Sequence, residues 1–107
     1  MLPRSDLEFH ILLALGSGPA HGYAIGKDVE ARSAGRLNPA TGALYQALRR
    51  LTEDGLIAPA AAPDEADARR KYLALTPAGR RAASEEAARL DALVRAAREK
   101  KLYAQRA

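Results

Sequence analysis

The C-terminal part of the chain constrains the fold most strongly, because its composition predicts one uninterrupted helix. Thr76 followed by Pro77 is a typical helix start, since threonine caps a helix and proline suits its first position. From there to about Tyr103, helix-forming residues dominate and neither proline nor a mid-helix glycine interrupts them. Roughly 27 residues at about 1.5 Å each give about 40 Å, which exceeds the width of a domain of this size. We therefore expect this helix to project.

One face of this predicted helix is apolar along its length. A helix that projects from a small core needs another helix to cover such a stripe, and the simplest partner is the same helix of a second copy in a two-fold dimer. In the alternative, the stripe packs against its own domain, whose core is too small to cover all of it. The stripe comprises Ala83, Ala87, Leu90, Leu93, Val94 and Ala97.

Composition argues against several classes of protein. Cysteine is absent, and neither His10 nor His21 has carboxylates at metal-ligand spacing, so we expect no metal site and no cofactor. The chain offers no nucleophile or acid–base pair around which an active site could form, so we do not expect an enzyme. No signal peptide or membrane span is recognisable, which predicts a cytoplasmic protein. The net charge of +4 favours nucleic acid or an anionic membrane as the partner.

Three shorter helices are predicted before the long one. Ser5 and Glu8 have the spacing of a capping box, so the first helix covers about residues 6–15. The glycines and proline of residues 16–19 end it. A second, short helix follows and closes at Gly35.

The third predicted helix has a clear core face and a free face. Asn38 followed by Pro39 is its start signal, and it runs to Asp54 with Gly55 as its stop. Its apolar stripe, at a period of about 3.6 residues, consists of Leu44, Ala47, Leu48 and Leu51. The other side is free to contact a partner.

Two short strands are predicted between the third helix and the long one. They cover residues 56–58 and 71–76, and the second alternates in the way typical of a half-buried strand. The segment 59–70 between them has no periodicity, so the two strands should pair as a hairpin around a long loop.

This order of elements is typical of a winged helix-turn-helix DNA-binding domain. The fold class is thus mainly α (α+β), with a two-stranded wing and a long C-terminal helix. Residues 1–76 form the DNA-binding domain, and residues 77–107 form the dimerisation helix. The partner that this fold predicts is double-stranded DNA.

In such a domain the third helix presents its N-terminal half to base edges in the major groove. The side chain of Gln46 suits adenine and that of Arg49 suits guanine, whereas Thr41 suits phosphate or a thymine methyl group. Gly42 is small, so the helix can approach DNA closely.

Most of the chain resembles the PadR-like family of bacterial transcriptional regulators. The resemblance implies a homodimeric regulator, usually a repressor released by a small molecule, of the short subclass with a single C-terminal helix. It also implies that Tyr45 meets DNA, and that the first helix, with Leu7 and Ile11, joins the last in the dimer interface. The matching stretches are DLEFHILLAL (6–15), GPAHGYAI (18–25), TGALYQALRRL (41–51), DGLI (54–57), RRKY (69–72) and LTPAG (75–79).

Several of the predicted DNA contacts have structural alternatives. Arg69, Arg70 and Lys71 at the base of the wing suit phosphate, or they form a charged strand edge that prevents aggregation. Tyr23 suits phosphate at the start of the second helix, but a capping or core role explains it equally well. Tyr45 could instead pack against the second helix, and His21 is expected to be a turn residue that hydrogen-bonds to the backbone.

The sequence thus predicts a sequence-specific DNA-binding transcriptional regulator, a dimeric repressor of a pseudo-palindromic operator. The rival interpretation is a winged-helix module that binds protein, with no specific affinity for DNA. A third interpretation is an architectural protein that binds DNA without sequence specificity. The modest net charge of +4 argues against it.

Overall fold

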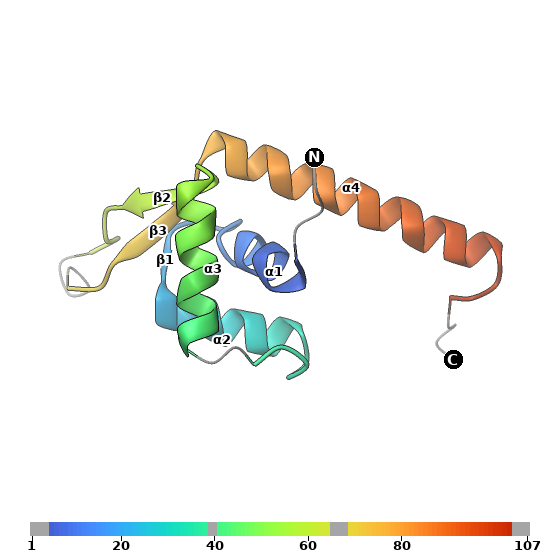
Figure 1. The fold of residues 1–107 in the computed structure, drawn as a ribbon, viewed down its shortest axis with the longest axis horizontal. Coiled ribbons are helices and arrows are strands. Elements are labelled where there is room, and N and C mark those ends of the chain that lie inside the picture. Colours follow the sequence, from blue (N-terminus) through green and yellow to red (C-terminus); the bar gives the residue numbers. More distant parts are fainter. Residues whose placement is uncertain (1–4, 39–40, 65–68, 104–107) are drawn as a thin grey trace.

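The computed structural model describes residues 5–38, 41–64 and 69–103, and this part of the chain forms four helices and three short strands. Helices α1, α2 and α3 cluster beside a small sheet, and α4 lies along the side of this cluster next to α1 and extends well beyond it (Figure 1). The prediction of a mainly helical chain with a small β component is confirmed. The elements are α1 (Asp6–Ala14), β1 (Ala20–His21), α2 (Gly22–Arg32), α3 (Thr41–Glu53), β2 (Ile57–Ala60), β3 (Tyr72–Leu75) and α4 (Pro77–Glu99).

The predicted capping signals explain most of the helix ends. The Ser5 hydroxyl accepts a hydrogen bond from the Glu8 amide at 3.2 Å, so α1 begins where the capping box predicts. Gly35 and Gly55 have φ angles of 79° and 76°, the left-handed conformation that ends a helix at little cost for glycine. The start signal at Pro39 lies outside the described residues.

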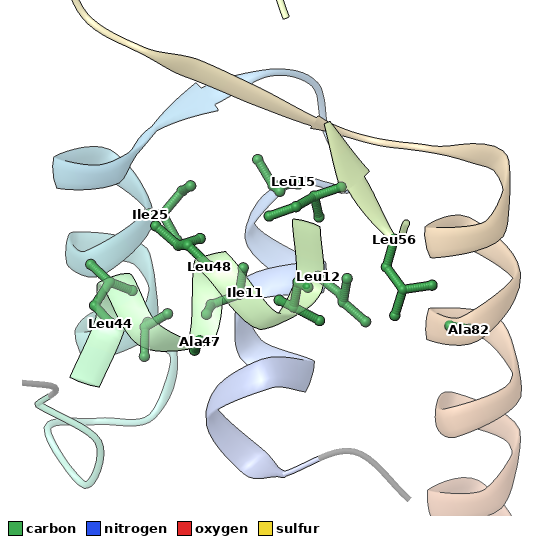
Figure 2. Close-up of a cluster of buried hydrophobic side chains, with 12 residues drawn as sticks. Ile11, Leu12, Leu15, Ile25, Leu44, Ala47, Leu48, Leu56 and Ala82 are labelled. Atoms are coloured by element: carbon green, nitrogen blue, oxygen red, sulfur yellow. The ribbon is translucent and has the colours of Figure 1, made fainter. Parts of the chain in front are cut away.

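The hydrophobic core lies where the three short helices meet (Figure 2). The predicted apolar stripe of α3 is buried in full, and it packs with residues of α1 and α2. Leu56 and Ala82 extend this core towards α4. The largest fully buried side chains belong to Ile11, Leu12, Leu15, Ile25, Val29, Leu51 and Ile57.

The predicted place of Ile11 in the dimer interface is wrong. Its side chain is 0% exposed within the single chain, so no surface of it is left for a second copy. Helix α1 contacts α2, α3 and α4, and for that reason its buried residues do not form one stripe. The four-residue spacing between Leu7 and Ile11 therefore indicates that Ile11 belongs to the core.

The sheet has three strands in the order β1-β3-β2, so a strand that the sequence did not predict, β1, joins the expected two-stranded wing. Strands β2 and β3 form the expected antiparallel hairpin, in register from Ile57 opposite Leu75 to Ala60 opposite Tyr72. The additional strand β1 pairs with the other edge of β3, with His21 opposite Tyr72. This pairing joins the start of α2 to the N-terminal half of β3.

Gly79, in the first turn of α4, lies too close to the hairpin for any side chain. A Cβ atom there would collide with the backbone carbonyl oxygen of Leu56, which cannot rotate away. The same junction is held by hydrogen bonds from the Thr76 hydroxyl to the Gly55 oxygen at 2.6 Å and from the Thr76 amide to the Leu56 oxygen at 3.1 Å.

Gly79→Ala is therefore expected to lower the free energy of unfolding by about 1–3 kcal/mol, the usual cost of overpacking. Urea denaturation of the purified variant measures it. Gly42→Ala is the matched control, since a Cβ atom at Gly42 on α3 meets open space and alanine favours a helix by up to about 1 kcal/mol. Unchanged stability of Gly79→Ala would contradict the packing of α4 on β2.

Helix α4 is the projecting helix that the sequence predicts. Its 23 residues span about 34 Å, and the longest extent of the molecule is 51 Å against 29 and 24 Å across. The helix ends before the predicted Tyr103, because Lys101 has a φ of 59° and the Leu102 amide bonds back to the Ala97 oxygen at 2.8 Å. None of the helices in the described ranges is sufficiently long and apolar to span a membrane.

Glu86 is a buried acid on α4 that is paired with Arg89. The Nε and Nη2 atoms of Arg89 donate to the two carboxylate oxygens at 2.9 and 2.7 Å. These hydrogen bonds lower the pKa of Glu86 below its ordinary value of 4.5. The contribution of the pair to stability is thus complete above about pH 4.5 and is lost as the pH falls through the lower pKa of the folded state.

We expect the Tm of the wild type to exceed that of Glu86→Gln at neutral pH, and the difference to shrink as the pH falls below about 4.5. Thermal melts monitored by circular dichroism over a pH series measure this. The control is Glu85→Gln, at an exposed position beside it. A difference that does not vary with pH would show that the Glu86–Arg89 pair does not link stability to protonation.

Candidate nucleic-acid interface

A groove of about 690 Å³ lies between α3, the start of α2 and β3. In Figure 1, α3 stands beside the sheet and its N-terminal half crosses the start of α2. Strand β1 directly precedes α2 and pairs with β3, so the start of α2 lies next to β3 and both line the groove. The lining residues are His21, Gly22, Tyr23, Tyr45, Leu48, Arg49, Thr52, Arg70, Lys71 and Leu73.

The groove is cationic and gathers residues that are far apart in the sequence. Arg49 comes from α3, and Arg70 and Lys71 come from the segment that leads into β3. None of the described residues that line it is acidic. Leu48 and Leu73 add apolar surface to the same lining, and the three cations make the groove suitable for an anionic partner.

Five of the nine predicted DNA contacts line this groove, namely Tyr23, Tyr45, Arg49, Arg70 and Lys71. Three others, Gly42, Gln46 and Arg69, are exposed but lie outside it. Thr41 is the first residue of α3. The structure thus brings five of the predicted residues together, and their contact with DNA stays a prediction.

Tyr45 contacts α2 and solvent at once. Its hydroxyl oxygen lies only 2.7 Å from the place where a Cβ atom of Gly22 would be. The side chain nevertheless remains 49% exposed, and that of Tyr23 is 66% exposed. Packing against the second helix and contact with a partner are thus compatible for Tyr45, and glycine at position 22 permits both.

His21 is a groove residue that the sequence did not predict. Its Nδ1 atom accepts a hydrogen bond from the Ala24 amide at 3.2 Å and so caps α2, which confirms the expected bond to the backbone. The ring also meets Tyr72 edge-on at 5.3 Å. Its Nε2 atom lies 2.9 Å from Nη1 of Arg70. Histidine is not among the usual N-cap residues, so its position offered little signal.

The adjacent arginines of α3 have different roles. Arg50 donates from Nε to the carboxylate of Glu8 at 3.1 Å, and the Glu8 side chain is largely buried. This ion pair joins α3 to α1 and fixes the angle at which α3 is presented. Arg49 faces the groove and remains available for an external ligand.

The predicted dimer stripe on α4 is exposed mainly in its C-terminal half. Leu93 and Val94 are 56% and 38% exposed, and Ala87 is exposed as well. Leu90 and Ala97 are half-buried. In contrast, Leu7 and Ala83 pack partly against the core of their own chain.

In residues 5–38, 41–64 and 69–103, no group of three or more histidine, cysteine, aspartate or glutamate side chains is close enough to hold a metal ion.

Residues 11–85 match the model of the transcriptional regulator PadR-like family. The chain belongs to this family. Membership confirms the resemblance noted from the sequence, and the family is one of transcriptional regulators and not of enzymes. An uncharacterized 37.1 kDa protein in transposon Tn4556 of Streptomyces fradiae is 42% identical over 83 residues, which are 78% of this chain. The chain spans 22% of the length of that relative.

Solved PadR-family structures share the fold. A PadR-like transcription factor from Bacteroides fragilis is 29% identical with a TM-score of 0.70, and 87% of each chain is covered. A PadR family regulator from Clostridium difficile is 22% identical with a TM-score of 0.75, covering 89% of this chain and 97% of that one. Bacillus subtilis PadR in complex with operator DNA is 22% identical with a TM-score of 0.63, covering 76% and 46%. The predicted winged-helix fold is confirmed.

Proposed function

We propose that this PadR-like protein is a cytoplasmic, homodimeric repressor that binds double-stranded operator DNA through the cationic groove and the exposed face of α3. The observation that supports the proposal best is the convergence of Arg49, Arg70 and Lys71 on one groove beside α3 whose described lining includes no acidic residue. The solved complex of Bacillus subtilis PadR with operator DNA supports the DNA-binding part of the proposal.

Each part of the surface has a distinct task in this proposal. Gln46 and Arg49, one turn apart on α3, read base edges in the major groove. Arg70, Lys71 and Tyr23 bind phosphate oxygens and set the position of α3 on the duplex. Both cations come from the segment that leads directly into β3.

Dimerisation supplies both affinity and operator symmetry. The apolar residues Leu93 and Val94 of the projecting α4 pair with the same helix of a second copy. Two α3 helices then enter successive major grooves about 34 Å apart, so the operator is an inverted repeat. Residues 77–107 thus serve as the dimerisation helix and residues 1–76 as the DNA-binding domain.

Salt dependence of duplex binding distinguishes this function from a protein-interaction module. Fluorescence anisotropy with a labelled duplex should show affinity falling steeply with salt, since each neutralised phosphate contributes about 0.9 to the slope of log K against log salt. The triple variant Arg49→Gln, Arg70→Gln, Lys71→Gln should flatten that slope. A folded protein with no salt-sensitive affinity for duplex DNA would overturn the proposal.

Gly22→Ala is expected to weaken operator binding, because the added methyl group would push Tyr45 out of its place at 2.7 Å from this position. The loss should be about tenfold, comparable to one phosphate or base contact. In the background of Tyr45→Ala the same change should cost much less, as the clash is gone. Equal losses in both backgrounds would show that Gly22 does not act through Tyr45.

A further inference from the structure

We propose that Glu8 is a positioning residue for the reading of DNA sequence. Through its ion pair with Arg50 it sets the rotation of α3 about its own axis. The geometric part of this inference rests on the structure of the single chain, whereas its effect on DNA recognition rests on the proposed function. Glu8 acts through α3 and not by contact with the duplex.

Glu8 is a buried acid in the first turn of α1. The residue is 7% exposed, and its Oε2 atom accepts a hydrogen bond from Nε of Arg50 at 3.1 Å. Arg50 lies 42 positions further along the chain, in the C-terminal half of α3. A carboxylate that is largely removed from water is costly unless charged partners and hydrogen-bond donors hold it. The place of Arg50 relative to α1 is therefore specified by more than apolar packing.

Apolar packing alone defines the rotation of α3 only loosely. The buried stripe of this helix determines which face meets the core, but hydrophobic contacts have no direction and apolar cores tolerate repacking. A charged hydrogen bond, in contrast, has a narrow range of length and angle. Arg50 directly precedes Leu51 of the stripe, so the ion pair restricts a small rotation that the stripe would allow.

The direction of Arg50 also determines that of the side chains proposed to read DNA. Consecutive residues of an α-helix are about 100° apart around its axis, so Arg49 lines the groove when Arg50 reaches α1. Contacts to base edges require side chains held to within about 0.5 Å and 10–20°, whereas attraction to phosphate falls off gradually with distance. Loss of the Glu8 charge should therefore reduce base discrimination more than general affinity for DNA.

A second acid in the same turn of α1 provides a matched control. Asp6 pairs with Arg36 at 3.3 Å, but the two side chains are 70% and 65% exposed, and such a pair contributes little. Asp6→Asn removes one negative charge from the same helix end as Glu8→Gln does. Glutamine also suits the third position of a capping box. A difference between the two variants thus reports on the buried contact with Arg50.

The first experiment measures fluorescence anisotropy with two duplexes, one that the wild type selects from a random pool and one of the same composition in scrambled order. Glu8→Gln should bind the selected duplex about tenfold more weakly than Asp6→Asn, and the scrambled duplex equally well. Equal affinities of the two variants for the selected duplex would overturn the proposal. Tighter binding of Glu8→Gln to both duplexes would overturn it as well, since Arg50 would then be a phosphate ligand that Glu8 holds back.

A double variant separates positioning from stability. Arg50→Gln leaves the buried carboxylate of Glu8 without the Nε donor, so its Tm should fall further than that of Glu8→Gln. The double variant Glu8→Gln, Arg50→Gln should regain much of this Tm but not the affinity for the selected duplex. Recovery of both quantities would show that the pair contributes only to stability, contrary to the proposal.

Residual dipolar couplings of the free protein test the orientation of α3 without DNA. In Glu8→Gln the amide couplings of α3, referred to those of α1 and α2, should differ from those of the wild type, and in Asp6→Asn they should agree with them. Unchanged couplings of α3 in Glu8→Gln would overturn the positioning role. A wild type that selects no duplex, together with a reoriented α3 in Glu8→Gln, would refute the proposed function and leave the role of Glu8 in placing α3 intact.

Discussion

The double variant Leu93→Asp, Val94→Asp is expected to be a folded monomer at concentrations at which the wild type is a dimer. Both side chains are largely exposed in the single chain, so the substitutions should leave its core unchanged. In the dimer they would bury unpaired charges on both copies, which costs several kcal/mol. The dimer Kd should therefore rise by more than about a hundredfold.

Sedimentation velocity measures the mass of each variant, and circular dichroism verifies that it is folded. The matched control is Ala88→Asp, Ala92→Asp, which adds the same charge on the opposite side of α4 at two exposed positions. This control should remain dimeric. A dimer of unchanged stability in the Leu93→Asp, Val94→Asp variant would place the interface elsewhere, and a monomeric wild type would refute dimerisation through α4.

Arg49→Ala is expected to lower operator affinity by about 1–3 kcal/mol, or roughly 5- to 150-fold. Arg49 lines the groove from α3 and, unlike Arg50, is not needed to hold α3 against α1. Arg49→Lys should recover little of the loss if the side chain reads guanine, since lysine cannot make the same paired hydrogen bonds.

Competition between operators that differ at single base pairs distinguishes base reading from phosphate binding. If Arg49 reads a base, Arg49→Ala should lose discrimination at one position of each half-site. A uniform loss on all sequences would show that it binds only phosphate. Arg95→Ala is the control, because Arg95 is exposed on the projecting part of α4 and pairs with Asp91. The affinity of the Arg95→Ala variant for the operator should match that of the wild type.

Local signals predicted those parts of the fold that depend on neighbours in the sequence. The capping serine of α1, the glycines after α2 and α3, and the apolar stripe of α3 act over a few residues, so their pattern is readable directly. The stripe also determined which face of α3 is free. For this reason the sequence pattern assigns Arg49 to the candidate surface, whereas Tyr45 is assigned to it by the resemblance to the family.

Features that depend on tertiary contacts were missed or wrong. Strand β1 is two residues long and exists because it pairs with β3, so no alternation could reveal it. Without β1, the sequence did not place His21 beside Arg70 in the groove. Ile11 was assigned to the dimer because periodicity alone does not distinguish a core face from an interface.

Selection of bound sequences from a random pool of duplex DNA tests the central claim most directly. The account predicts enrichment of an inverted repeat whose half-sites are about one helical turn apart, bound by two copies of the chain with a steep salt dependence. The Arg49→Ala variant should enrich a more degenerate motif. Failure of the folded wild type to enrich any motif, together with salt-independent or absent duplex binding, would contradict the account and favour a protein partner.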